Sequence, residues 1–203
     1  MPRPRLREAQ KQMTRRLLLE QALGIFEVKG YAATTIDDIA AAAGTTRTTF
    51  YMHFSSKAQL MQELVAVLDE IFTSADDPPL RQVVSSGDRR LVRAFIETKA
   101  DQWPATRSYV IAANQAAAVE PDIAATREQW YEATIAEMQH GLDDAGRFEP
   151  DTRLVRCSLA FGELEWLSVR WMQRGWNLVD RETALGILTD SWCHLLTDDG
   201  PRS

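Results

Sequence analysis

The most constraining feature of this sequence is a series of closely spaced helix starts and stops that begins at residue 35. Residues 35–38 (TIDD) place a hydroxyl at a helix N-cap and a carboxylate three positions later, a pattern known as a capping box. Gly44 ends that short helix, and the hydroxyl of Thr46 can cap a second helix over residues 47–52. Two short helices joined by a tight glycine turn predict a helix-turn-helix.

Helical periodicity continues on both sides of this segment, whereas the alternating apolar and polar runs typical of strands are nearly absent. Four helices are predicted within residues 10–73: the first ends at Gly30, and the fourth opens on a second capping box at residues 56–59 (SKAQ). A loop rich in Ser, Asp and Pro is expected at 73–88. Five more helices are predicted at 89–101, 104–118, 121–145, 152–174 and 181–197. The chain is therefore expected to be all-α, with about nine helices.

Charge is distributed unevenly along the chain. Residues 1–57 carry nine Lys and Arg against five Asp and Glu, a net charge of +4, although the whole chain carries −6. The rest, residues 58–203, is net −10. A basic first quarter suggests a segment that binds nucleic acid, and the acidic remainder would be repelled by the negative charge of nucleic acid. We therefore predict a three-helix helix-turn-helix domain at 1–57 and a second helical domain at 58–203.

Composition excludes several classes of protein. The chain is 45% hydrophobic and 26% charged, as in globular proteins, and no apolar run approaches the ~20 residues of a membrane span. The basic start does not resemble a signal peptide, so a cytoplasmic location is expected. Cys157 and Cys193 fit no metal-ligand spacing, and we expect no metal and no cofactor. These two thiols are interpreted as buried side chains, with a redox sensor as the alternative.

The second short helix carries small or polar residues at its exposed positions, so it fits a DNA major groove about 12 Å wide. Arg47 stands at the N-terminal end of this helix, where a guanidinium can form two hydrogen bonds to a guanine. Phe50 and Phe54 are expected to face inward and to anchor the helix.

This region resembles the TetR/AcrR family of DNA-binding regulators. The matching patterns are LLxxAxxIF at 18–26, GYxxTTIxxIAxxAG at 30–44 and TFYxHFxxKxxL at 49–60. The total length and the all-helical remainder are also similar to that family. Thr45 and Thr48 depart from the family pattern, because an aliphatic residue and a glycine are usual at these positions. The operator preferences of the family are therefore not carried over.

Position by position, the resemblance implies two kinds of DNA contact. Phosphates would be bound by Thr35, Thr46, Tyr51, His53 and Lys57, and bases would be approached by Arg47, Thr48 and Thr49. Hydroxyl, phenol and ammonium groups at helix starts suit phosphates, which fix the register of a protein without reading sequence. The alternative is a purely structural cap for the two capping threonines and partial burial for the tyrosine. The basic arm before residue 17 would either lie along the minor groove or phosphates, or remain a solvated tail.

The C-terminal helices carry more apolar surface than one buried face requires. Residues 152–174 show two apolar stripes, and the last helix is similarly broad. This pattern favours a homodimer, which the resemblance also implies, in which these two helices form a four-helix bundle with the second copy. The predicted interface residues are Phe161, Leu164, Trp171, Leu188, Trp192 and Leu195.

Aromatic residues are frequent in the body, with five of the six Trp between residues 103 and 176. An apolar cavity for a small molecule is one explanation, and ordinary core and interface packing is the other. The candidate pocket residues combine aromatic and polar groups: Trp103, Tyr109, Asn114, Trp130, Glu163 and Trp166. The carboxylate among them would either neutralise a cationic ligand or pair with a nearby arginine.

The sequence thus predicts a repressor of the TetR type that binds a palindromic operator in double-stranded DNA as a homodimer and is released by an unidentified small-molecule effector. No Walker, Rossmann, GxSxG or HExxH pattern is present, so we do not expect an enzyme. An enzyme or carrier with a helical N-terminal bundle is the first alternative, and an activator or nonspecific nucleoid protein is the second. Retention on duplex DNA would distinguish a repressor from an enzyme or carrier. Preference for one DNA sequence would distinguish it from a nonspecific DNA-binding protein.

Overall fold

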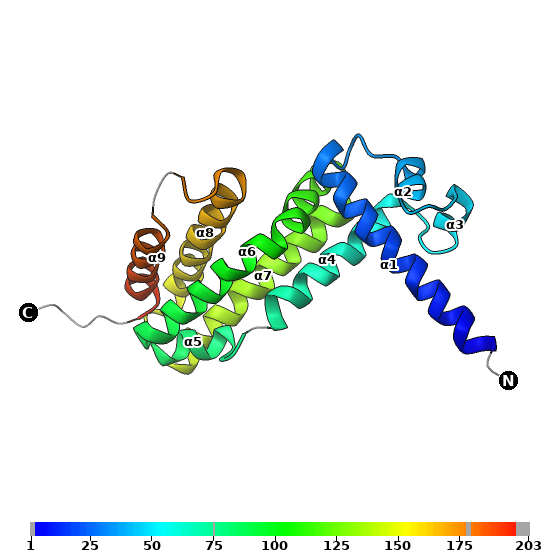
Figure 1. Cartoon of the computed structure of the whole chain (residues 1–203). Coiled ribbons are helices and arrows are strands. Elements are labelled where there is room, and N and C mark those ends of the chain that lie inside the picture. Colours follow the sequence, from blue (N-terminus) through cyan, green and yellow to red (C-terminus); the bar gives the residue numbers. More distant parts are fainter. Residues whose placement is uncertain (1–2, 75, 178–179, 198–203) are drawn as a thin grey trace, which may run out of the picture. The chain divides into compact units, whose positions relative to one another are not determined.

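The computed structural model describes residues 3–74, 76–177 and 180–197, and every regular element within them is an α-helix (Figure 1). The helices are α1 (Arg3–Lys29), α2 (Ile36–Ala42), α3 (Arg47–Tyr51), α4 (Lys57–Ser74), α5 (Leu80–Ser86), α6 (Arg89–Ala117), α7 (Pro121–Asp144), α8 (Pro150–Arg174) and α9 (Arg181–Leu196). The predicted all-α class is confirmed. The chain divides into two compact units, Met1–Glu70 with Thr106–Arg127, and Ile71–Ala105 with Glu128–Ser203.

The first unit is built around one apolar core that α1 to α4 share with the second half of α6 and the start of α7. Its largest fully buried side chains are Leu18, Phe26, Tyr31, Ile39, Phe50, Phe54, Leu60, Met61, Leu64 and Ile123. Small residues of α6, such as Ala112 and Ala116, allow the helices to approach closely against this core. The unit therefore includes segments from well beyond residue 57, while the predicted functional boundary at that residue stays a prediction.

Helix α1 begins earlier than the sequence suggested. The first helix was expected from about residue 10, with a basic arm before it, but α1 already starts at Arg3. Residues 5–12 are mostly Arg, Leu, Glu, Gln and Lys, which have high helix propensity. The side chain of Gln12 also donates to Glu8 one turn earlier, at 2.9 Å.

The second unit contains a helix that the sequence analysis treated as loop. α5 has Pro79 at its N-cap, and it ends at Gly87, which adopts a left-handed φ of 63°. Val83 and Val84 are buried. Gly141 of α7 explains their close packing, since a Cβ there would lie 2.7 Å from the Arg81 carbonyl oxygen and 2.8 Å from the Val84 Cβ.

Helix α6 is continuous, whereas the sequence analysis split it into two helices at Pro104. The proline lies inside α6. It cannot donate an amide hydrogen bond, which normally favours a break. Ala100 and Trp103 before the proline and Thr106 after it are all buried. This burial outweighs the local cost of the proline.

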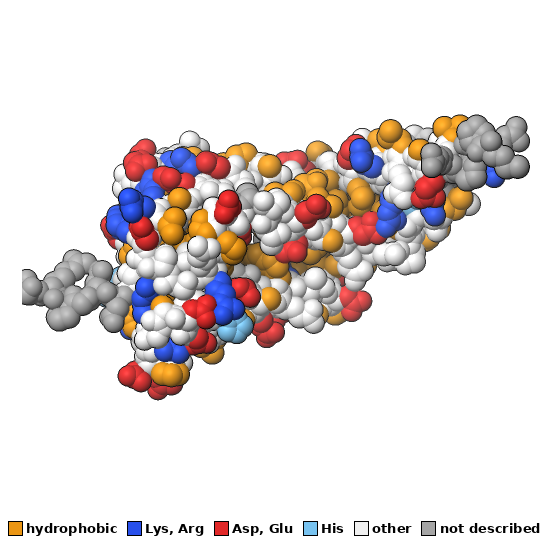
Figure 2. All heavy atoms as spheres, turned by 90° about the horizontal axis from the view of Figure 1, so that it is seen from below, with side chains coloured by type: hydrophobic (Ala, Val, Ile, Leu, Met, Phe, Trp, Pro, Cys, Tyr) orange, Lys and Arg blue, Asp and Glu red, His pale blue; other side chains and the backbone are white. Residues whose placement is uncertain are grey.

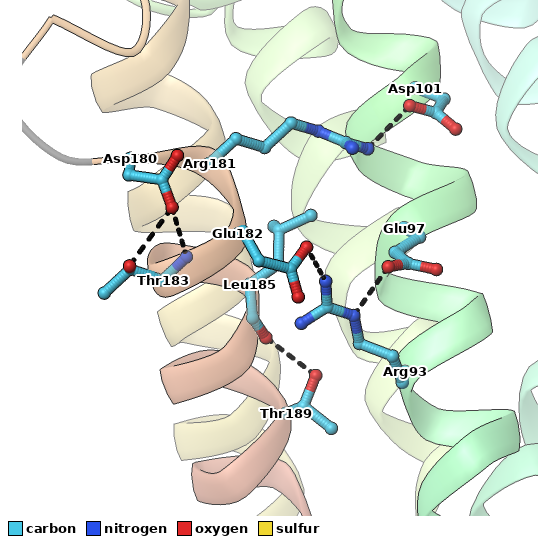
Figure 3. A network of polar contacts seen from close by, with 9 residues as sticks. All are labelled: Arg93, Glu97, Asp101, Asp180, Arg181, Glu182, Thr183, Leu185 and Thr189. Carbon is cyan, nitrogen blue, oxygen red and sulfur yellow. Dashed lines mark hydrogen bonds and ion pairs between the residues drawn. The ribbon is translucent and has the colours of Figure 1, made fainter.

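Helices α8 and α9 lie alongside each other (Figure 1). The indole nitrogen of Trp192, a fully buried side chain, donates to the Ala160 carbonyl at 2.7 Å. Polar contacts join the start of α9 to α6 (Figure 3). There the guanidinium of Arg93 lies between Glu97 and Glu182, at 2.7 Å from each carboxylate.

Candidate nucleic-acid interface

The start of α2 has the capping box that the sequence predicted. The Thr35 hydroxyl accepts from the Asp38 amide at 3.1 Å, and the Asp38 carboxylate accepts from the Thr35 amide at 2.8 Å. Lys29, the last residue of α1, donates to the same carboxylate at 2.6 Å. Together with the Thr35 bonds, this Lys29 contact holds the pKa of Asp38 well below its usual range. The carboxylate therefore joins the end of α1 to the start of α2.

The start of α3 is capped as predicted. The Thr46 hydroxyl accepts from the Thr49 amide at 3.2 Å, so it satisfies a donor freed at the helix start. Gly44 precedes it with a left-handed φ of 63°, as the tight turn requires. Phe50 is fully buried and anchors the helix. This local structure produces the predicted helix-turn-helix.

The side chains predicted to approach bases differ in exposure. Arg47 and Thr48 are exposed, and Thr49 is half-buried. The neighbouring Tyr51, which was predicted to bind a phosphate, is 46% exposed. The Arg47 guanidinium donates to Asp37 at 2.9 Å and to the Tyr51 hydroxyl at 3.3 Å. The Tyr51 bond, with the Asp37 carboxylate, raises the pKa of Arg47, so this side chain is always charged. The ion pair between Arg47 and Asp37 was not predicted from the sequence.

Lys57 has a structural role in addition to its predicted phosphate contact. Its ammonium donates to the carbonyls of Tyr31 and Thr34, at 2.7 and 2.8 Å. It also lies 4.2 Å from the centroid of the Tyr31 ring. These contacts join the start of α4 to the loop between α1 and α2. Partial burial lowers the pKa of Lys57.

The segment after α3 is held by Arg15 of α1, a residue that the sequence analysis placed only in the basic arm. Arg15 donates to the His53 carbonyl at 2.9 Å, pairs with Glu63 and lies over the Phe54 ring. Burial, together with the charges of Arg15 and Lys11, lowers the pKa of His53. The lowered pKa favours the neutral imidazole in the DNA-free protein. Arg15 precedes Leu18 by three positions on the buried face of α1, and this spacing was the available signal.

Tyr31 connects the helix-turn-helix to the rest of the first unit. Its amide donates to the Gln115 side chain at 2.8 Å, and its hydroxyl donates to Glu120 at 2.9 Å. Burial and the neighbouring Glu120 carboxylate raise the pKa of Tyr31. The phenol is therefore a permanent donor, and the corner between α1 and α2 is fixed to α6 and the α6–α7 turn.

The six candidate pocket residues are distributed over both units. Tyr109 and Asn114 lie on the part of α6 that belongs to the first unit, and Tyr109 packs against the core there. Trp103, which is buried, contacts the rings of Trp171 and Trp176. A second aromatic cluster contains Phe72, Trp130, Tyr131 and Phe161.

The two remaining pocket candidates lie on α8. Glu163 accepts a hydrogen bond from Ser191 of α9 at 3.0 Å, and 66% of Trp166 is exposed. The pocket role of all six residues stays a prediction. Glu163 is thus used in the contact between α8 and α9, an interaction that the sequence analysis had not considered for it.

The predicted dimer residues are largely used within the protomer. Leu164, Leu188 and Trp192 are buried, while Leu195 is half-buried. Phe161 and Trp171 belong to the two aromatic clusters described above. The large apolar side chains that remain exposed on α8 and α9 are Leu154, Val155, Leu159, Trp166 and Ile187. The assignment of the six predicted residues to a dimer interface stays a prediction.

The other chemical groups of the described residues add little to the site. Cys157 and Cys193 are buried, and burial raises the pKa of Cys157 to about 12, so its thiol is protonated. No cluster of three His, Cys, Asp or Glu side chains suited to a metal occurs among the residues that the structure describes. None of the helices in that part of the chain is long and apolar enough to cross a membrane. On the face drawn in Figure 2, basic and acidic side chains are interspersed.

Comparison with known proteins gives a consistent result. Residues 18–64 match the family model described as bacterial regulatory proteins, tetR family. The HTH-type transcriptional repressor KstR2 of Rhodococcus jostii is 28% identical over 78% of this chain and 79% of its own length. The HTH-type transcriptional regulator TtgR of Pseudomonas putida is 46% identical, over 29% of this chain and 28% of its own.

The fold is shared with solved structures. NalD of Pseudomonas aeruginosa, described as the secondary repressor of the MexAB-OprM multidrug efflux pump, superposes with a TM-score of 0.68 at 22% identity. The match covers 93% of this chain and 99% of NalD. The family model thus matches residues 18–64 only, while the likeness in fold extends over nearly the whole chain.

Proposed function

The chain belongs to the TetR family of transcriptional regulators, and we propose that it is a repressor that binds an operator duplex through α2 and α3. The observation that carries this proposal is the geometry of α3, a five-residue helix that is capped by Thr46, anchored by Phe50 and exposed at Arg47 and Thr48. A short helix with a buried anchor and a polar outer face fits the major groove. The relatives named above are transcriptional regulators and repressors, which agrees with this function.

The proposed contacts divide into base reading and phosphate binding. Arg47, Thr48 and Thr49 approach base edges, and Thr35, Thr46, Tyr51, His53 and Lys57 bind phosphates. The test is to select operator sequences from a random duplex library and to measure affinities by fluorescence anisotropy. Arg47→Ala should weaken operator binding by about 1–3 kcal/mol and relax the preference at one base pair. An unchanged preference at every base pair would refute base reading by Arg47.

Lys57→Ala should weaken binding to operator and random duplex alike, since a phosphate contact carries no sequence information. Its bonds to the loop carbonyls require a stability control, so the melting temperature is measured in parallel. Selection of no preferred duplex by the wild-type protein would instead favour an enzyme, a carrier or a nonspecific DNA-binding protein.

A homodimer is the proposed assembly, and its interface is assigned to the exposed apolar stripe of α8 and α9. Val155, Leu159 and Trp166 follow each other at helical spacing, and more than half of each side chain is exposed. Gly162 lies in the same stripe, and a Cβ there would meet no atom within 4 Å. Such a patch is typical of an interface, and two-fold symmetry would place two α3 helices at half-sites roughly 34 Å apart in a palindromic operator. Leu159→Glu should convert the dimer to a monomer in light scattering, whereas an unchanged dimer mass would refute this interface.

Release by a small-molecule effector is the last part of the proposal. The two aromatic clusters of the second unit support it, because aromatic side chains commonly line ligand sites in helical proteins. The effector must bind the DNA-free state more tightly, since only differential affinity shifts the equilibrium. A thermal-shift screen identifies compounds that bind, and operator affinity is then measured in their presence. Compounds that bind tightly and leave operator affinity unchanged would contradict this mechanism.

A further inference from the structure

Arg47 is held between two side chains from different helices. Its Nη1 donates to the Asp37 carboxylate of α2 at 2.9 Å, and its Nη2 donates to the Tyr51 hydroxyl, one turn further along α3, at 3.3 Å. The guanidinium carbon lies 5.6 Å from the centroid of the Tyr51 ring. The side chain therefore extends across the turn of the helix-turn-helix and contacts both helices.

Stability alone does not account for this ion pair. The Arg47 and Asp37 side chains are 57% and 63% exposed, and ion pairs this exposed contribute little to folding. A carboxylate beside the reading helix also repels DNA phosphates, so it lowers overall affinity for any duplex. Asp37 also lies in the first turn of α2, where a carboxylate interacts favourably with the helix dipole, so its effect on the arginine is measured separately from stability.

We propose that Asp37 is a positioning residue that aims Arg47 at a base edge, so that the protein gains discrimination between sequences at the cost of overall affinity. This inference rests on the proposed function. Arginine has five N–H donors, and the two bonds to Asp37 and Tyr51 use two of them, so a two-pronged contact to a guanine remains possible. A side chain fixed in advance loses less conformational freedom when it binds.

Removal of the Asp37 charge is therefore expected to change affinity and specificity in opposite directions. In Asp37→Asn the repulsion of phosphates disappears, so affinity for an unrelated duplex should rise roughly 2- to 5-fold. The released guanidinium can turn toward phosphates, so discrimination at the base pair that Arg47 reads should fall roughly 3- to 10-fold. Asp37→Glu, which restores a carboxylate, should recover part of that discrimination.

The experiment uses the full chain and the operator selected by the wild-type protein. Affinities are measured for that operator, for each of its single-base-pair variants and for a scrambled duplex. The proteins compared are wild type, Asp37→Asn, Asp37→Glu, Arg47→Ala and the double variant of Asp37→Asn with Arg47→Ala. Glu20→Gln, at an exposed carboxylate of α1, is the matched control for loss of one negative charge.

The inference is supported if Asp37→Asn loses discrimination at the base pair affected by Arg47→Ala, and if this loss vanishes in the double variant. An equal gain on operator and scrambled duplex, as expected for Glu20→Gln, would show simple repulsion and overturn the inference. Increased discrimination would also overturn it, since Asp37 would then compete with DNA for the arginine. A uniform loss of binding with a lower melting temperature would indicate a folding role instead. Failure of the wild-type protein to select any duplex would refute the proposed function itself.

Discussion

Helices α3 and α6 depend on different kinds of interaction for their formation. α3 has five residues, and a cap at Thr46, a glycine turn before it and one buried phenylalanine define it, all within the seven positions 44–50. α6 has 29 residues and continues through Pro104, with buried side chains on either side of the proline. Local polar signals therefore define the helix proposed to read DNA, whereas distant apolar contacts define the helices of the body. The two kinds of helix should respond differently to substitution.

The largest effect is expected where tertiary burial defines a helix. Trp192→Ala in α9 removes a fully buried indole and its bond to the Ala160 carbonyl, so the free energy of unfolding should fall by about 3–5 kcal/mol. Urea denaturation measures this change. The control is Val28→Ala in α1, where 90% of the side chain is exposed and a change within about 0.5 kcal/mol is expected. A loss at Trp192 as small as that of the control would contradict the contrast drawn above.

An intermediate effect is expected from alanine at two helical glycines. Gly141→Ala places a Cβ against the Arg81 carbonyl and Val84 of α5, so it should destabilise the protein by about 1–3 kcal/mol. Gly24→Ala in α1 meets no atom within 4 Å and should stabilise it by about 0.5–1 kcal/mol through helix propensity. Chemical denaturation of both variants gives the sign of each change. Stabilisation of both variants would mean that propensity, and not packing against α5, decides the outcome at Gly141.

A smaller loss of stability is expected when the N-cap of α3 is removed. Thr46→Ala removes the cap of α3, so the free energy of unfolding should fall by roughly 1 kcal/mol. Hydrogen exchange of the α3 amides should increase more than exchange in α8, because only the local signal is lost. Thr46→Ser keeps the hydroxyl and should behave like the wild type. Equal increases in both helices would show that α3 is not defined locally.

The smallest effect is expected from pH. The folded protein holds the pKa of Asp38 below its ordinary value of 3.8, so this carboxylate stabilises the fold when ionised and loses that contribution as pH falls below the ordinary value. Unfolding free energy measured from about pH 5 to pH 3 should therefore fall less steeply in Asp38→Asn than in the wild type. Parallel curves for the two proteins would show that the contacts with Lys29 and Thr35 add nothing to stability.

This contrast explains which parts of the fold were predictable. The caps at Thr35 and Thr46 and the glycine ends of the early helices are encoded by a few adjacent residues, and the structure confirms them. α5 was missed because its two buried valines gain their stability from Gly141, more than fifty positions away. The break expected at Pro104 follows a valid local rule that burial of the neighbouring residues overrides.

The candidate site shows the same division. The residue types and exposed positions of α3 followed from its sequence and from the family resemblance, although their DNA contacts are still predictions. The partners of Arg47, Lys57 and Tyr31 were not predictable, because each contact joins two separate elements of the fold. Burial of Leu164, Leu188 and Trp192 within the protomer was not predicted, for a related reason. A helix with two apolar stripes does not reveal which stripe faces its own protomer.

The extension of the first core into α6 and α7 limits how this protein can be engineered. Ala112, Ala116 and Ile123 complete the apolar interior beneath α1 to α4, and Gln115 and Glu120 hold Tyr31. A fragment cut after residue 57 would expose that interior to water and would be prone to aggregate. Chimeras that exchange the DNA-reading head between relatives should therefore carry residues 106–127 together with the head, and fusions made only at the end of the helix-turn-helix should fold poorly.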